Sequence, residues 1–365
     1  MKNLRKVLWA APLVALTLLS ACGSGNDSTP SEDTVAVTPD TDVTEDTTAS
    51  EPAGDTSMGD IPAGSVEVVI EGDITTWAGK KVGIANLAPV PGAERWSKSL
   101  QACIEDNGGT VDYQDVGGDG TKLPALLEGW AAANVAAVFN IGIDMTGQES
   151  LIAAFTKKNT PVVTWGAGNP EGVVALDANQ VEDGRIIGRY LVETVKTGPI
   201  IMVNANNPAL QMRESGLKEV LDAAGIEMIL VGEALGFSAE SAQKSVEAAL
   251  QANPEATAVV GGFGSLGVGA ATAVTSAGSK AVVVSMNGDP EEYDAIRSGG
   301  SFVATVADGH EFGGLAACQI AANLIAGGAA PGEAGKAILT TSVLVTADNL
   351  PAAGSSEATP RKFYQ

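Results

Sequence analysis

Two successive stretches of the chain alternate short β-branched runs with amphipathic helical patterns. In the first, strands are expected at residues 82–85, 110–113, 136–139 and 161–164, with helices at 94–107, 123–133 and 147–158. After a short strand at 173–176, the second gives strands near 200–203, 227–231, 258–260 and 282–285, separated by helices at 212–224, 239–252 and 267–277. This spacing indicates parallel sheets with right-handed crossovers. The chain is therefore predicted to be an α/β protein of two doubly wound parallel-sheet lobes, with ligands beyond the carboxyl ends of the strands.

The length and charge of the chain narrow its organisation and its partners. The roughly 300 residues after residue 63 exceed what one compact core holds, which also favours two subdomains. The formal net charge is −23. An acidic surface of this kind disfavours nucleic acid and anionic lipid as partners.

The N-terminus has the features of an export signal. Lys2, Arg5 and Lys6 precede the apolar run 7–19, which is too short for a membrane span of ~20 residues. Leu19-Ser20-Ala21-Cys22 resembles the bacterial lipobox, which implies a signal peptide at 1–21 and a lipid on the Cys22 thiol. The resemblance places the protein on the extracytoplasmic face of the cell membrane. The alternative is an ordinary cleaved signal followed by a coincidental cysteine.

Residues 22–64 are expected to form an acidic, disordered linker. Between Gly23 and Pro62 there are ten carboxylates, no Lys or Arg and no aromatic residue. Such a segment buries too little apolar surface to offset the entropy of ordering. Forty flexible residues span roughly 35 Å, which would hold a domain clear of lipid headgroups. A purely solubilising role is the alternative.

Enzyme motifs are weak in this sequence. Gly262-Phe263-Gly264-Ser265-Leu266-Gly267 matches a dinucleotide-binding pattern, but it occurs late in the chain and Asn287 replaces the usual ribose-binding carboxylate. Gly117-Gly118-Asp119-Gly120-Thr121 resembles the glycine-rich loop of nucleotide-dependent kinases, and a polar turn is the simpler interpretation. His310 is the only histidine, and no Cys, His and Asp cluster has metal-ligand spacing. We therefore predict no enzymatic activity, no cofactor and no metal.

From about Lys80 to Asn349 the sequence resembles the type I periplasmic binding proteins of ABC importers, the ribose and galactose type above all. The resemblance rests on four places in order, which are 177–188, 213–217, 283–290, and 302–308 together with 345–349. It implies two lobes joined by three crossover strands. The expected divisions are a binding domain at 65–349, with lobe 1 at 80–177 and 309–340 and lobe 2 at 178–308 and 341–349, then a tail at 350–365.

The function implied by this resemblance is that of a substrate-binding lipoprotein of an ABC importer. It would capture a small polar ligand, a sugar or sugar-like metabolite, by hinge closure between the lobes and then dock on a membrane permease. A monomer is expected. The alternative is a binding protein of the same fold that passes a ligand signal to a membrane receptor.

The resemblance also places ligand-contacting residues. Polar contacts are expected from Asn140, Asp144, Gln211, Arg213, Asn287 and Asp308, and ring stacking from Trp96, Trp165 and Phe263. For several of these a structural role stays open: a core aromatic for Trp165, a helix cap for Asp144 and a salt-bridged residue for Arg213. For His310 a satisfied histidine beside the hinge is the preferred interpretation.

The sequence departs from the sugar-binding pattern at three loops. Trp165-Gly166-Ala167-Gly168 stands where the family usually has Asp-Arg, and Phe263-Gly264 stands where Asn-Asp is common. Residues 90–96 replace a segment that opens the first helix in the family. The predicted cleft therefore has fewer hydroxyl-reading groups and more apolar surface. A deoxy or modified sugar, a nucleoside or another small metabolite fits this better than ribose or glucose.

The cysteine count allows one internal disulfide. With Cys22 lipidated, Cys103 and Cys318 remain in an oxidising compartment. Cys103 lies on the first helix and Cys318 on a helix expected at 311–325, and these helices are neighbours in a sheet of order 2-1-3-4-5. We predict a disulfide between them, with two buried free thiols as the alternative.

Overall fold

A computed structural model describes residues 61–232, 236–354 and 361–365 of the chain. The predicted signal peptide, the predicted lipidation site Cys22 and nearly all of the predicted linker lie outside the described residues. Within the described residues, every helix is too short or too polar to cross a membrane.

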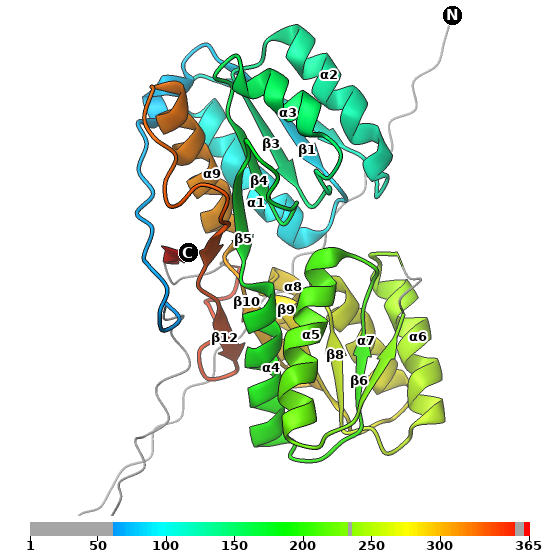
Figure 1. The fold of residues 1–365 in the computed structure, drawn as a ribbon. Coiled ribbons are helices and arrows are strands. Elements are labelled where there is room, and N and C mark those ends of the chain that lie inside the picture. The colour runs from blue at the N-terminus through cyan, green and yellow to red at the C-terminus, as the bar shows by residue number, and fades with distance from the viewer. Residues whose placement is uncertain (1–60, 233–235, 355–360) are drawn as a thin grey trace, which may run out of the picture. The chain divides into compact units, whose positions relative to one another are not determined.

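The first lobe is a seven-stranded sheet of order β13-β11-β5-β4-β3-β1-β2, parallel except for β13 (Figure 1). The β-branched runs of the sequence supply its strands, and β3 is buried along its whole length because helices lie on both faces. Its elements are η1 (Ile74–Trp77), β1 (Lys81–Asn86), α1 (Pro91–Glu105), β2 (Thr110–Asp115), η2 (Gly120–Lys122), α2 (Leu123–Ala133), β3 (Ala137–Ile141), α3 (Glu149–Thr156), β4 (Val162–Trp165), β5 (Val174–Ala178), α9 (His310–Ile325), β11 (Ile338–Thr340) and β13 (Phe363–Tyr364).

The second lobe is a six-stranded sheet of order β12-β10-β9-β8-β6-β7, in which only β12 is antiparallel. β6 and β8 are fully buried strands at its centre. Its elements are α4 (Gln180–Thr194), β6 (Ile200–Val203), α5 (Pro208–Ala223), β7 (Met228–Val231), α6 (Ala239–Ala252), β8 (Ala258–Gly261), α7 (Gly264–Ser276), β9 (Val282–Asn287), α8 (Pro290–Arg297), β10 (Phe302–Ala307) and β12 (Val343–Thr346).

The predicted fold class is confirmed. Both lobes contain the strand order 2-1-3-4-5, as β2-β1-β3-β4-β5 in the first and β7-β6-β8-β9-β10 in the second. The chain passes between the lobes from β5 to α4, from β10 to α9 and from β11 to β12 (Figure 1). It then returns to the first lobe, where β13 pairs with β11.

The segment before β1 is bound to the C-terminus of the chain. Val66 and Gln365 exchange two backbone hydrogen bonds of 3.0 Å, and the Val68 N–H donates to the Phe363 carbonyl over 2.7 Å. These bonds add residues 66–68 to the outer edge of the first sheet, beside β13. The two ends of the described domain therefore hold each other in place.

Helices α1 and α9 are neighbours on one face of the first sheet, and Cys103 on α1 is bonded to Cys318 on α9. This is the pairing expected from the sequence. The indole N–H of Trp77 lies 3.1 Å from Cys318 Sγ, so the disulfide is enclosed by the core of the lobe. In the second lobe, α4 and α5 pack closely because glycines face backbone: a Cβ at Gly216 would lie 1.9 Å from the Val181 carbonyl oxygen.

Candidate functional site

A cavity of about 120 Å³ lies at the carboxyl ends of the strands of both sheets. The loops that follow β1, β3 and β4 supply its wall from the first lobe, and those that follow β6, β7, β8 and β9 supply the wall from the second. This is the edge at which doubly wound sheets bind ligands. The lining residues are Asn86, Leu87, Ala88, Val90, Ala93, Ile141, Gly142, Trp165, Gly166, Gln180, Asn207, Ala209, Leu210, Arg213, Phe237, Phe263, Asn287 and His310.

Four of the residues predicted from the sequence line this cavity: Trp165, Arg213, Phe263 and Asn287. Trp165 follows β4 and packs on α9, where a Cβ at Gly313 would lie 2.1 Å from its ring. Phe263 precedes α7 and lies 6.0 Å from the Phe237 ring, between centroids. The Trp165 ring of the first lobe and the Phe263 ring of the second thus border the same cavity.

The other five predicted residues do not line the cavity. Trp96 is fully buried in the core of the first lobe, and Asn140 is buried with its side-chain amide donating to the Ile143 carbonyl over 2.7 Å. The Asp144 carboxylate accepts hydrogen bonds from the Thr146 backbone N–H and hydroxyl. These bonds hold a local turn.

Gln211 and Asp308 also lie outside the lining. The exposed Gln211 amide donates to Asn206 Oδ1 over 3.0 Å on the outer side of α5. Asp308 is fully buried behind the lining and holds residues that do reach the cavity. Its role in this arrangement is that of a positioning residue.

Arg213 is at the centre of the polar side chains that line the cavity. Asn207 caps α5 by accepting the Ala209 N–H over 2.9 Å, and this start places Arg213 on the inner side of the helix. The guanidinium donates to Gln180 Oε1, Gly262 O, Asn287 Oδ1 and Asp308 Oδ2 over 2.6 to 2.9 Å. Its side chain is only 4% exposed.

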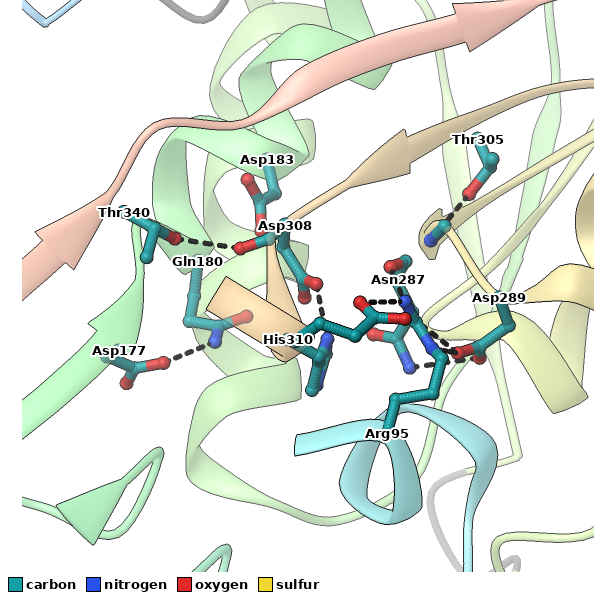
Figure 2. A network of polar contacts seen from close by, with 12 residues as sticks. Arg95, Asp177, Gln180, Asp183, Asn287, Asp289, Thr305, Asp308, His310 and Thr340 are labelled. Atoms are coloured by element: carbon teal, nitrogen blue, oxygen red, sulfur yellow. Dashed lines mark hydrogen bonds and ion pairs between the residues drawn. The ribbon is translucent and has the colours of Figure 1, made fainter. Parts of the chain in front are cut away.

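His310 lines the cavity, and the buried Asp308 behind it holds its ring (Figure 2). The Asp308 carboxylate oxygen Oδ1 lies 2.5 Å from His310 Nδ1, and its backbone carbonyl accepts the Thr340 hydroxyl over 2.7 Å. Burial acts to raise the pKa of Asp308, but His310 and Arg213 hold that pKa below its ordinary value. Burial acts to lower the pKa of His310, and the Asp308 carboxylate raises it above the ordinary value. The imidazole also lies 5.5 Å from the Trp165 ring, between centroids.

Two further carboxyls, the half-buried Asp177 and the buried Asp183, lie beside this network. Burial raises the pKa of Asp177 to about 6, although Gln180 donates to its Oδ1 over 2.6 Å. Burial likewise raises the pKa of Asp183 to about 7, and Asp183 Oδ2 lies 3.9 Å from Arg213 Nη2. Both lie close to the β5–α4 crossing between the lobes (Figure 2). Ionisable side chains are therefore concentrated at the hinge, directly behind the cavity.

Asn287 connects the cavity with the contact between the lobes. Its backbone has φ +130°, a conformation that costs free energy in a non-glycine residue and needs surrounding bonds to hold it. Arg95 of α1 donates to the Asn287 carbonyl over 3.0 Å, while Arg213 donates to its side-chain oxygen over 2.8 Å. Gly92 permits this approach of α1, since a Cβ there would lie 2.9 Å from Asn287 Nδ2.

The sequence analysis missed several lining residues. Asn86 ends β1, Asn207 and Phe237 follow β6 and β7, and Gln180 opens α4. Their position at or after strand ends was the available signal for the first three, because parallel strands end at one edge of the sheet. His310 also lines the cavity, in addition to having the bonded environment expected of a hinge-side histidine.

Among the described residues, no Asp or Glu lines the cavity. The described part of the chain also contains no group of three or more His, Cys, Asp or Glu side chains placed to hold a metal ion. The chemistry available at this cavity is therefore hydrogen bonding and apolar contact.

Comparisons with known proteins agree with this geometry. The sequence profile of the family described as "Periplasmic binding protein domain" matches residues 87–329. A D-ribose/D-allose-binding protein of Pseudomonas aeruginosa is 28% identical over 110 residues, which are 29% of this chain and 34% of that protein's length. The chain thus matches about a third of the length of that curated relative.

Solved structures share the fold. An ABC transporter solute binding protein from Mycobacterium smegmatis with bound glycerol aligns with a TM-score of 0.67 and 20% identity, covering 77% of this chain and 100% of the other. A 5-methylthioribose transporter solute binding protein from Thermotoga lettingae aligns with a TM-score of 0.66 and 22% identity, covering 73% of this chain and 85% of the other.

Proposed function

Because the chain belongs to the periplasmic binding protein domain family, we propose that it is the substrate-binding protein of an ABC importer for a small sugar-like or polyol-like ligand. The family is one of binding proteins and not of enzymes, in agreement with the sequence analysis. The observation that carries the proposal is the cavity whose walls come from both lobes, at the carboxyl ends of both sheets. A ligand in this place touches both lobes at once and therefore favours their closed arrangement.

The proposed ligand contacts come from both walls. The Trp165 and Phe263 rings offer apolar faces to the C–H groups of a ring or chain. Asn287 and His310 supply hydrogen bonds, and Arg213 holds Asn287 in position through its 2.8 Å bond to the side-chain oxygen. The buried partners of Arg213 fix these groups before the ligand arrives, which lowers the entropy lost on binding.

The contact between Arg95 and the second lobe completes the proposed closing mechanism. Arg95 of the first lobe donates to Asp289 and to the Asn287 carbonyl in the second lobe. Because Asn287 also contacts the ligand, ligand binding and the contact between the lobes stabilise each other. The closed form, with both lobes in fixed relative positions, is the form that we propose docks on the permease.

We further propose that the mature chain is lipid-anchored at Cys22 and tethered by residues 22–64. The lipobox-like sequence and the acidic composition of this segment support the proposal. Membrane fractionation tests it: the native chain should sediment with membranes, whereas the C22A variant should be released in soluble form. A native chain found wholly in the soluble fraction would contradict lipid anchoring.

A thermal unfolding screen tests the binding function. The purified full chain is heated with single sugars, deoxy sugars, polyols, nucleosides and amino acids. A ligand at 1,000 times its Kd stabilises the folded state by ~4 kcal/mol, which raises the midpoint by several degrees. We expect a hit among the sugars, deoxy sugars or polyols, lost in W165L and kept in the matched control W130L, since Trp130 lies on α2 away from the cavity. No shift with any compound would contradict the proposed function.

A further inference from the structure

The hydrogen-bonding capacity of the cavity is small, because its strongest donor is already engaged. The Arg213 guanidinium donates hydrogen bonds to four partners at distances of up to 2.9 Å. In addition, its Nη2 lies 3.9 Å from the Asp183 carboxylate. The cation is compensated by the buried Asp308 carboxylate, at 2.8 Å. Four of its five N–H groups are therefore engaged, which leaves one N–H and no uncompensated charge for an anionic ligand.

The remaining polar groups of the wall are few. Within the described residues, Asn86 Oδ1 is buried with no hydrogen-bond partner, and His310 Nε2 has none either. Gln180 and Asn287 each donate one bond to a carboxylate and accept one from Arg213, which leaves about one amide hydrogen on each. With the side-chain NH2 group of Asn207, which also lines the cavity, these groups provide roughly six hydrogen bonds, fewer than the five hydroxyls of a hexose can form.

Another part of the lining is apolar and comes from both lobes. Val90 of the first lobe packs against the hydrophobic core of the second, which includes Leu210 and Phe263, with Phe237 beside them. These four residues (Val90, Leu210, Phe237 and Phe263) form what we call the apolar wall. A hydroxyl placed against it loses its hydrogen bonds to water without replacement, which weakens binding. An alkyl or thioether group there loses nothing and buries apolar area.

We propose that the ligand is a neutral, sugar-like molecule with one apolar end, such as a deoxy or alkylthio-substituted sugar, bound with that end against the apolar wall. Among the described residues the lining offers no Asp or Glu to a cationic ligand, and the Arg213 charge that would attract an anionic ligand is already paired with Asp308. This inference rests on the proposed binding function and specifies its substrate class.

Matched pairs of compounds test the proposal by isothermal titration calorimetry with the full chain. Each pair differs only where a hydroxymethyl oxygen is replaced: L-fucose against L-galactose, L-rhamnose against L-mannose, and 5-methylthioribose against ribose. We expect the deoxy or alkylthio member to bind at least tenfold more tightly in every pair that binds. Tighter or equal binding of the parent sugars overturns this inference and leaves the proposed function standing. No binding by any of the six compounds, together with a flat unfolding screen, overturns both.

A variant of the apolar wall provides the second measurement. Phe237 is only half-buried, so F237S removes apolar surface with little risk to folding. We expect the preference within each pair to fall by about tenfold, the equivalent of 1.4 kcal/mol. The matched control F363S changes a half-buried phenylalanine on β13, far from the lining, and should keep the preference. An unchanged preference in F237S would contradict contact with the apolar wall.

Discussion

Arg95 of the first lobe forms an ion pair with Asp289 of the second, with Nη2 2.9 Å and Nε 3.2 Å from the same carboxylate oxygen (Figure 2). Asp289 precedes α8, whose first turn also contains Glu292 in a capping box. Arg95 additionally donates to Glu311 of α9 over 2.6 Å, which holds the guanidinium in place. One side chain of α1 thus joins the start of a helix in each lobe.

The first prediction concerns this ion pair. R95Q removes charge-assisted bonds that exist only while the lobes are in contact, and such bonds contribute about 1.5–3 kcal/mol. We expect the Kd for the best ligand to rise by roughly 10- to 100-fold, as measured by calorimetry. The control R185Q breaks an exposed pair with Glu219 inside the second lobe and should leave the Kd unchanged. An unaltered Kd in R95Q would show that this contact has no part in closure.

The second prediction concerns Arg213. Its replacement by Met removes the guanidinium that pairs with the buried Asp308 carboxylate, and breaking a buried pair in this way costs about 3–5 kcal/mol. Urea unfolding of R213M should show that loss. The control R189M removes an arginine that is 52% exposed and should change the free energy of unfolding by less than about 1 kcal/mol. Equal effects of the two variants would contradict the central place of Arg213.

The third prediction follows from the His310 and Asp308 pair. The raised pKa of His310 means that its contribution to stability is present below about pH 6.5 and is lost as the pH rises through the folded-state pKa. The lowered pKa of Asp308 gives a contribution present above about pH 4 and lost in stronger acid. The difference in free energy of unfolding between the wild type and H310Q should therefore shrink from pH 6 to pH 9. A difference independent of pH would refute the assignment.

The fourth prediction concerns Glu292, where stability again falls as the pH rises. Burial, and then the neighbouring Asp289 carboxylate, raise the pKa of Glu292 from 4.5 to about 8, although Ser285 and Thr305 donate hydrogen bonds to it. The folded state then binds the extra proton between these values, so stability falls as the pH rises from 4.5 to 8. E292Q should remove this slope in urea unfolding curves. E291Q, its exposed neighbour on α8, should retain it, and identical slopes in both variants would disprove the shift.

The fifth prediction concerns the disulfide between α1 and α9. Cys103 and Cys318 are separated by 215 residues, so the bond strongly restricts the unfolded chain. Replacing both by alanine should lower the free energy of unfolding by about 2–5 kcal/mol. Mass measurement after alkylation in denaturant provides the direct check: neither cysteine should react without reductant, and both should react with it. Labelling of both without reductant would rule out the bond.

Much of the fold was predictable because its strands are short, β-branched and regularly spaced. The expected ranges 200–203, 123–133 and 239–252 coincide with β6, α2 and α6. β13 was not predictable, since two residues carry no periodicity and their pairing with β11 depends on the fold itself. A long-range partner of this kind leaves no local pattern in the sequence.

The site was predicted less completely, for reasons visible in single residues. Trp96, Leu100 and Ile104 repeat every fourth position on α1 and are all fully buried, so helical periodicity already indicated a core position for Trp96. Arg95, one residue earlier, points to the other lobe, and only the tertiary arrangement of the lobes gives it Asp289 as a partner. Strand ends located the cavity, whereas side-chain directions within loops decided which residues line it.

A crystal structure of the full chain with the tightest ligand from the screen tests the central claim most directly. We predict ligand density between the lobes, in contact with Trp165, Asn287 and Phe263, with Arg95 bound to Asp289. Density in the groove at the other end of the first sheet, lined by residues from 156–162, 169–174 and 324–338, would contradict the proposed binding site.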